Sequence, residues 1–138
     1  TDHLQPIVPL TVDDTFMQLT LEAISPNLSK EGTDIFATLK ELKEKIDTPS
    51  MIKPRQIVFL SDGEDTTLKL NIPAIEQLVA QLAAQGITFN VVGLGTAEGG
   101  PIPDLTYENS PVISKKNESL LRALSTGGQG QYVDPQHI

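Results

Sequence analysis

The sequence predicts an α/β fold built on an open, mostly parallel sheet with helices on both faces. Residues 57–60 form a short, unbroken apolar run, IVFL, which is typical of a strand covered on both sides. A second buried run follows at residues 87–94. Helical periodicity separates these runs and returns after the second one. Because strands that alternate with helices are joined by crossovers, the sheet is expected to be parallel.

The first part of the chain predicts a weak edge strand and then a helix. Two prolines interrupt residues 7–10, and proline removes donors from a strand ladder. Thr11 and Asp14 resemble a capping box with Thr11 as the N-cap. The helix should end near Pro26, because the residue before proline avoids the helical region. Its apolar stripe is expected to contain Met17, Leu21, Ile24 and Leu28.

A turn at residues 30–34 leads into a second predicted helix. On its solvent-exposed face, Glu41 and Lys45 have the i,i+4 spacing of a stabilising ion pair. Residues 47–54 contain two prolines and are expected to be a loop. The buried face of this helix is expected to consist of Ile35, Phe36, Leu39, Leu42 and Ile46.

The second half of the chain predicts two more helices and a final strand. Asn71 and Pro73 begin a third helix, and Gly86 ends it. Residues 95–104 are rich in glycine and proline and are expected to be irregular. Asn117 is the expected N-cap of a fourth helix. A short extended piece is expected at residues 112–114, a last strand at 131–133, and a third-helix core of Ile75, Leu78, Val79, Leu82 and Ala83.

Composition limits the function classes. The 138 residues suit one domain, and the net charge of −8 disfavours a nucleic-acid partner. There is no cysteine, which excludes disulfides and thiolate chemistry. No apolar run approaches the roughly 18 residues that a membrane span requires. The chain begins at Thr1 and not at methionine, so an excised segment is expected.

The candidate site follows the central strand. Asp62 comes directly after the apolar run, at the end of a parallel strand where ligands bind. Thr33 follows a glycine at the start of the second helix, and its hydroxyl with the Asp62 carboxylate would suit a hard cation such as Mg²⁺. Two alternatives stay open: Thr33 caps its helix, or the acidic loop is simply solvated. Glu64 and Asp65 are expected to be solvated or helix-capping, not ligands.

Several segments together resemble a von Willebrand factor A domain of the bacterial aerotolerance (Bat) type. The ordered series spans essentially the whole chain and is more specific than any one piece. The resemblance implies a Rossmann-like fold and a single domain over residues 1–138. The matching segments are residues 9–11 (PLT), 31–33 (EGT), 59–65 (FLSDGED), 86–95 (GITFNVVGLG), 99–103 (GGPIP), 114–121 and 126–128.

Such domains bind protein ligands through a metal-ion-dependent adhesion site. On this sequence the resemblance implies Thr33 and Asp62 as metal ligands. The family's remaining ligand loop, Asp-x-Ser-x-Ser, does not occur in the 138 residues. We therefore expect a domain fragment without the family's first strand, first helix and second strand, and with no tightly held metal of its own.

The resemblance implies a non-enzymatic interaction module. Its intact parent is expected to bind an acidic side chain of a partner protein through Mg²⁺ or Mn²⁺. The parent is expected to be anchored in the bacterial inner membrane, with this domain in the periplasm. The chain alone is expected to self-associate, either by pairing along the free edge of the strand at residues 57–60 or by exchanging elements between chains.

Two other function classes remain as alternatives. One is a metal-free scaffold domain of a membrane-anchored complex. The other is a metal-dependent hydrolase that uses Asp62, Glu64 and Asp65. The hydrolase is disfavoured because no lysine, arginine or histidine adjoins the acidic loop to stabilise developing negative charge.

Overall fold

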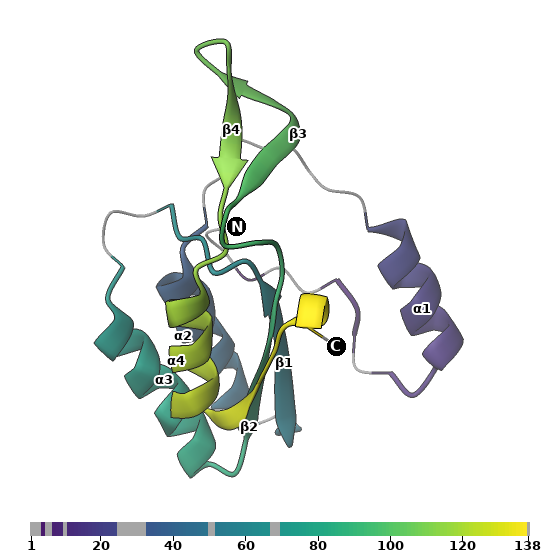
Figure 1. Cartoon of the computed structure of the whole chain (residues 1–138). Coiled ribbons are helices and arrows are strands. Elements are labelled where there is room, and N and C mark those ends of the chain that lie inside the picture. The colour runs from purple at the N-terminus through teal and green to yellow at the C-terminus, as the bar shows by residue number, and fades with distance from the viewer. Residues whose placement is uncertain are drawn as a thin grey trace.

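A three-stranded parallel sheet forms the centre of the computed structural model, which describes residues 4, 7–9, 11–24, 33–49, 52–66 and 70–137. Its strands are β1 (Gln56–Ser61), β2 (Thr88–Gly93) and β5 (Gln129–Val133), in the order β1-β2-β5. The β1–β2 register pairs Gln56 with Thr88 and continues without a shift to Ser61 and Gly93. The predicted α/β class with a parallel sheet is confirmed (Figure 1).

Three helices pack together on one face of this sheet: α2 (Ile35–Ile46), α3 (Ile72–Ala84) and α4 (Glu118–Gly127). Strand β2 alternates, so Phe89 and Val91 point into the helices and are fully buried. The predicted apolar faces of the second and third helices are confirmed. The core consists of Ile35, Leu39, Ile46, Ile75, Val79, Leu82, Ile87, Phe89, Val91, Leu120, Leu121 and Leu124.

The opposite face of the sheet is open within the described part of the chain. Val58 and Leu60 point to it from β1 and are 54% and 61% exposed. The expectation that residues 57–60 are covered on both sides therefore holds for one face only. A groove of about 730 Å³ runs along this open face, lined by Arg55, Gln56, Val58, Thr88, Asn90, Val92, Gln129, Gly130, Gln131 and Val133. None of these lining residues carries a carboxylate.

Strand β5 lies unusually close to β2. The register shifts between Phe89 and Val91, and a side chain at Gly130 would place its Cβ 1.9 Å from the carbonyl oxygen of Phe89. That distance is far inside van der Waals contact, so glycine alone fits this position. The side chain of Asn90 supports the shift by accepting a hydrogen bond from the Gln131 N–H at 3.0 Å.

Helix α1 (Asp14–Ala23) begins differently from the prediction. Its N-cap is Asp13, whose Oδ1 accepts a hydrogen bond from the Phe16 N–H at 2.9 Å. The predicted N-cap, Thr11, lies two residues earlier, and its hydroxyl accepts a hydrogen bond from the Asp13 N–H. The segment offers two capping side chains, and the carboxylate occupies the cap because acidic groups are favoured at helix N-termini.

Helix α1 also differs in its packing. It contains no buried residue, and Met17, Leu21 and Ile24 are all exposed. Figure 1 shows it set apart from the helices and sheet that form the core. Leu28 lies outside the described residues, and the described residues 7–9 form no strand. The predicted stripe therefore has no partner among the described residues.

Two further strands form a hairpin where the sequence predicted an irregular loop. β3 (Gly100–Tyr107) pairs antiparallel with β4 (Ser110–Ser114) and projects from the core (Figure 1). The turn residues Glu108 and Asn109 have φ values of 50° and 63°. Two such residues define the tight turn that suits a hairpin's twist, although glycine usually supplies the second one. The prediction for residues 95–104 was wrong from Gly100 onward.

The other predicted helix ends are confirmed. Asn71 caps α3 through the Ala74 N–H, and Asn117 caps α4 through the Leu120 N–H. Gly86 follows α3 with φ of +80°. The predicted final strand extends two residues further back, to Gln129, and a short 3₁₀ turn, η1 (Pro135–His137), follows it.

Candidate functional site

The candidate site lies at the carboxyl edge of the sheet. Because the three strands are parallel, the residues that follow them meet at one edge. Asp62 follows β1, Thr96 lies just beyond β2, and Asp134 follows β5. The sequence predicted only the first of these three positions.

Asp62 is half-buried, and both of its carboxylate oxygens accept hydrogen bonds. Oδ1 accepts from the Glu64 N–H at 3.0 Å, and Oδ2 accepts from the Ser114 hydroxyl at 2.9 Å. The backbone carbonyl of Asp62 accepts from the Asn117 N–H at 2.7 Å. Gly63 turns the chain here with φ of 73°, and a Cβ on it would lie 2.9 Å from the Asn117 carbonyl oxygen. The carboxylate is therefore held in a fixed orientation.

Thr33 lies beside the end of β1. Its N–H donates to the Thr66 hydroxyl at 2.7 Å, and its carbonyl accepts from the Thr66 N–H at 3.0 Å. Thr66 belongs to the loop that begins with Asp62, so these bonds fasten Thr33 to that loop. A small pocket of about 180 Å³ lies at this position, lined by Thr33, Ile35, Thr38, Phe59, Leu60 and Ser61.

The alternative that Thr33 caps α2 is wrong. The N-cap is the next residue, Asp34, whose Oδ1 accepts from the Ala37 N–H at 2.8 Å. The reason is local geometry: the carboxylate of Asp34 reaches the third N–H of the helix. The Thr33 side chain is therefore not required for capping.

Two of the three carboxylates after β1, those of Asp62 and Asp65, accept hydrogen bonds from different partners. Asp65 Oδ2 accepts a hydrogen bond from the Ile35 N–H at 3.0 Å, which places a negative charge at the N-terminus of α2. Glu64 and Asp65 were expected to be solvated or helix-capping, and Asp65 does bind the first N–H of α2, beside the N-cap Asp34. Asp62 turns instead toward Ser114. Within the described ranges, no three acidic or histidine side chains gather into one cluster.

A segment in which the sequence analysis placed no site residue crosses the whole edge. Residues 114–117, here called the crossing segment, connect the hairpin to α4. Lys116 N–H donates to the Thr96 carbonyl at 2.9 Å, beyond β2, and its ammonium donates to Asp134 Oδ2 at 2.6 Å, beyond β5. Ser114 and Asn117 bind Asp62 after β1. The crossing segment is thus attached to the end of every strand of the sheet.

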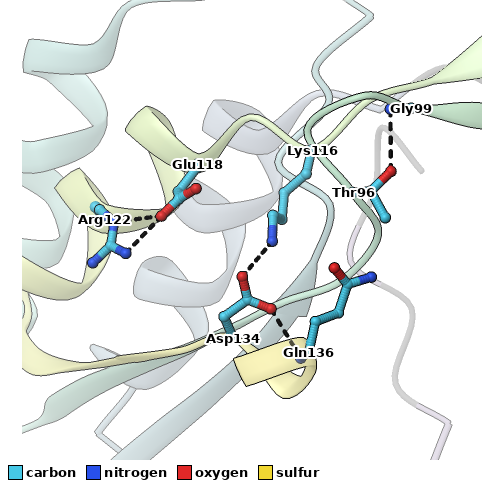
Figure 2. Close-up of polar contacts among 7 residues, drawn as sticks. All are labelled: Thr96, Gly99, Lys116, Glu118, Arg122, Asp134 and Gln136. Carbon is cyan, nitrogen blue, oxygen red and sulfur yellow. Dashed lines mark hydrogen bonds and ion pairs between the residues drawn. The ribbon is translucent and has the colours of Figure 1, made fainter. Parts of the chain in front are cut away.

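The Lys116–Asp134 ion pair is largely buried, with side-chain exposures of 3% and 12%. Figure 2 shows the lysine pointing at Asp134, which also accepts from the Gln136 N–H. The hydrogen bond to Asp134 raises the pKa of the Lys116 ammonium above its ordinary value, against the opposing effect of desolvation. The stabilisation is therefore fully present below the ordinary lysine pKa and is lost as pH rises through the raised pKa.

Sequence reasoning missed Ser114 and Lys116 as site residues. Ser114 was placed in a short extended piece, and 52 positions separate it from Asp62. The one available signal was the pair Lys115-Lys116 directly before the Asn117 cap, in a chain with 10 basic and 18 acidic residues. That signal indicates a nearby carboxylate without saying which one.

Fold and site together define a parallel α/β domain with hydroxyl and carboxylate oxygens at the carboxyl edge of its sheet. Two solved structures are similar to it. One is an aerotolerance-related membrane protein from Bacteroides fragilis, in a form with multiple mutations to serine: TM-score 0.72 and 29% identity over 92% of this chain. The other is the conserved hypothetical protein BatB from Bacteroides thetaiotaomicron: TM-score 0.72 and 27% identity over 93% of this chain.

Both similarities support the Bat-type resemblance. The chain spans 64% and 63% of the lengths of these two proteins. No family model matches the sequence, and no curated protein is significantly similar to it. The first neighbour is described as a membrane protein. In this chain, none of the helices within the described ranges is both long enough and apolar enough to cross a membrane.

Proposed function

We propose that this chain is a non-enzymatic interaction module of the von Willebrand factor A type. Its parent protein binds a partner protein through a Mg²⁺- or Mn²⁺-dependent site that includes Thr33 and Asp62. The observation that carries this proposal is the attachment of Thr33 to the loop of Asp62 through Thr66. Two residues that are 29 positions apart in sequence thereby reach one end of β1.

The side chains at this corner fit a hard cation in their chemistry. A hydroxyl and a half-buried carboxylate are oxygen ligands of the kind that Mg²⁺ prefers, and Mg²⁺ keeps several waters that a partner can replace. When bound, the cation supplies positive charge for an acidic side chain of the partner. Two protein side chains are few, so the chain alone binds Mg²⁺ weakly.

A metal-free scaffold is the second candidate, and one observation favours it. Both oxygens of Asp62 already accept hydrogen bonds from the protein itself. A carboxylate satisfied in this way needs no cation for its stability. The hydrolase alternative has less support, because Asp65 is engaged at the N-terminus of α2 and does not converge with Asp62.

We also propose that the parent is anchored in the inner membrane, with this domain in the periplasm. The similarity to a protein described as an aerotolerance-related membrane protein supports this location. The chain by itself self-associates along β1. Within the described residues, β1 pairs only with β2, so its other side presents unpaired backbone groups.

A pull-down from membranes that contain the full-length parent tests the adhesion proposal. Partner capture should require Mg²⁺ and disappear with a chelator. Asp62→Ala should abolish it, because the cation loses its only charged ligand among the named residues. Glu76→Ala, which removes an exposed carboxylate from α3, is the matched control and should capture normally. Equal capture by Asp62→Ala, with or without chelator, would establish the metal-free scaffold instead.

A further inference from the structure

The Ser114 hydroxyl lies where a third protein oxygen could reach a cation at Asp62. Its Oγ is 2.9 Å from Asp62 Oδ2 and is half-buried. Ser114 comes from the last position of β4, far from the loops that carry Thr33 and Asp62. We propose that Ser114 is an oxygen ligand of the cation site at Asp62. This inference rests on the proposed metal-dependent function and adds a residue to its site.

The separation of the two oxygens suits coordination of one ion. Mg²⁺ holds its ligands at about 2.0–2.1 Å in a near-octahedral arrangement, so neighbouring oxygens lie about 2.9 Å apart. Ser114 Oγ and Asp62 Oδ2 have this spacing, which O–H···O hydrogen bonds share, so the two oxygens need not move to reach one ion. The hydroxyl now donates its proton to the carboxylate. Rotation about the Cβ–Oγ bond turns a lone pair outward and moves no heavy atom.

The backbone that follows Ser114 is held firmly, which favours a ligand role. Lys116, two residues later, is attached to Thr96 by its N–H and to Asp134 by its largely buried ammonium. Asn117 N–H binds the carbonyl of Asp62 itself. The crossing segment therefore holds Ser114 and Asp62 at a fixed separation, and a ligand set works best when it is preorganised in this way.

Close packing before the crossing segment adds to this rigidity. A Cβ on Gly99 would lie 2.5 Å from the Lys115 side chain and 2.9 Å from the Ser114 carbonyl oxygen. The Gly99 N–H also donates to the Thr96 hydroxyl at 3.1 Å, as Figure 2 shows. The start of the hairpin thus packs against its end, so the Ser114 backbone has little room to withdraw from Asp62.

A change of metal preference distinguishes a ligand from a residue that only supports the site. Thiolates select soft metals, whereas hydroxyl oxygens select hard ones. Ser114→Cys should weaken Mg²⁺ binding by about tenfold and strengthen Cd²⁺ binding by at least about tenfold. The chain has no cysteine, so the introduced thiol is unique.

The experiment uses the purified 138-residue chain with MgCl₂ and CdCl₂ at up to millimolar concentration. Metal binding is followed by calorimetry, and direct Cd²⁺–thiolate contact by ultraviolet charge-transfer absorption. Ser110→Cys is the matched control, because Ser110 lies exposed at the other end of β4. Adding Asp62→Ala to Ser114→Cys should remove the gain in Cd²⁺ affinity. Ser114→Thr keeps a hydroxyl and should keep Mg²⁺ binding.

Three results would overturn the inference. Equal Cd²⁺ affinity of Ser114→Cys and Ser110→Cys would mean that any thiol binds the metal. Loss of Mg²⁺ binding in Asp62→Ala but not in Ser114→Ala would remove Ser114 from the site and leave the proposed function standing. Mg²⁺ binding that neither substitution changes would overturn both. Unfolding curves measured for each variant separate these results from a loss of fold.

Discussion

The two faces of the sheet are made by the same strands but differ in what covers them. On the helix face, Phe89 and Val91 are fully buried beneath α3 and α4. On the open face, the next positions of β2 line a groove together with Val58 and other residues of β1 and β5. Within the described part of the chain, helices α2 to α4 therefore stabilise the sheet by packing against one side only.

The groove side has a second distinguishing property. The chain carries 18 acidic residues, yet none of those in its described part lines the groove, where Arg55 is the only charged side chain among the described residues. Two copies of an acidic chain repel each other least where carboxylates are absent. The open face and the free edge of β1 are therefore the surfaces best suited to a second copy.

The largest expected effect compares truncations on the two faces. Phe89→Ala removes a fully buried ring and should lower the free energy of unfolding by about 3–5 kcal/mol. Leu60→Ala, at a position 61% exposed, should change it by no more than about 0.5 kcal/mol. Urea titrations measure both values, with the milder Phe89→Leu as a variant that retains the fold. A loss at Leu60 of several kcal/mol would show that the open face is covered in solution.

Sequence reasoning succeeded where one element's own pattern decides the outcome. The strand at β2, the start of α3 at Asn71 and the N-cap Asn117 are local signals, and each was predicted correctly. Thr11 was chosen as a cap although Asp13 lay two residues away, since two capping side chains compete within one short segment. The hairpin was missed because its turn, Glu108-Asn109, has no glycine.

The candidate site was only partly predictable, for a different reason. Asp62 could be found because a carboxylate directly follows a buried apolar run. Ser114 could not, since its role depends on how the chain returns to β1 after 52 residues. The open face of the sheet could not be predicted either. The apolar run at residues 57–60 indicates a strand suited to burial on both sides, and sequence alone does not say what covers each side.

A smaller effect is expected on self-association through the edge of β1. Val58→Lys places a charge on the open face beside the free edge, and copies paired antiparallel about Val58 would then oppose like charges. The dissociation constant should rise by about tenfold or more, the equivalent of about 1.4 kcal/mol. Sedimentation or light scattering across a concentration series measures it.

Ile113→Lys is the matched control for this experiment. Ile113 lies on the hairpin and is 55% exposed, against 54% for Val58, so both variants add the same charge at equal exposure. Ile113→Lys should associate as the unmodified chain does. Association through β1 would be contradicted if the unmodified chain stayed a monomer at all concentrations. It would also be contradicted if both lysine substitutions raised the dissociation constant equally.

The smallest expected effect compares two helix caps that look alike in sequence. Asn117 caps α4, which buries Leu120, Leu121 and Leu124, so Asn117→Ala should cost about 1 kcal/mol of global stability. Asp13 caps α1 with a shorter hydrogen bond, 2.9 Å against 3.2 Å for Asn117, but α1 buries nothing. Asp13→Ala should therefore leave global unfolding unchanged within about 0.5 kcal/mol and reduce only the helicity of residues 14–23.

Urea titration measures the global term, and amide hydrogen exchange within α1 measures the local one. Faster exchange in α1 with an unchanged unfolding midpoint is the expected result for Asp13→Ala. An equal drop in the urea unfolding midpoint for Asp13→Ala and Asn117→Ala would mean that α1 is packed against the core in solution. Its exposed apolar stripe of Met17, Leu21 and Ile24 and the uncovered groove beside Val58 would then be the two surfaces that meet, and the contrast between the two faces would disappear.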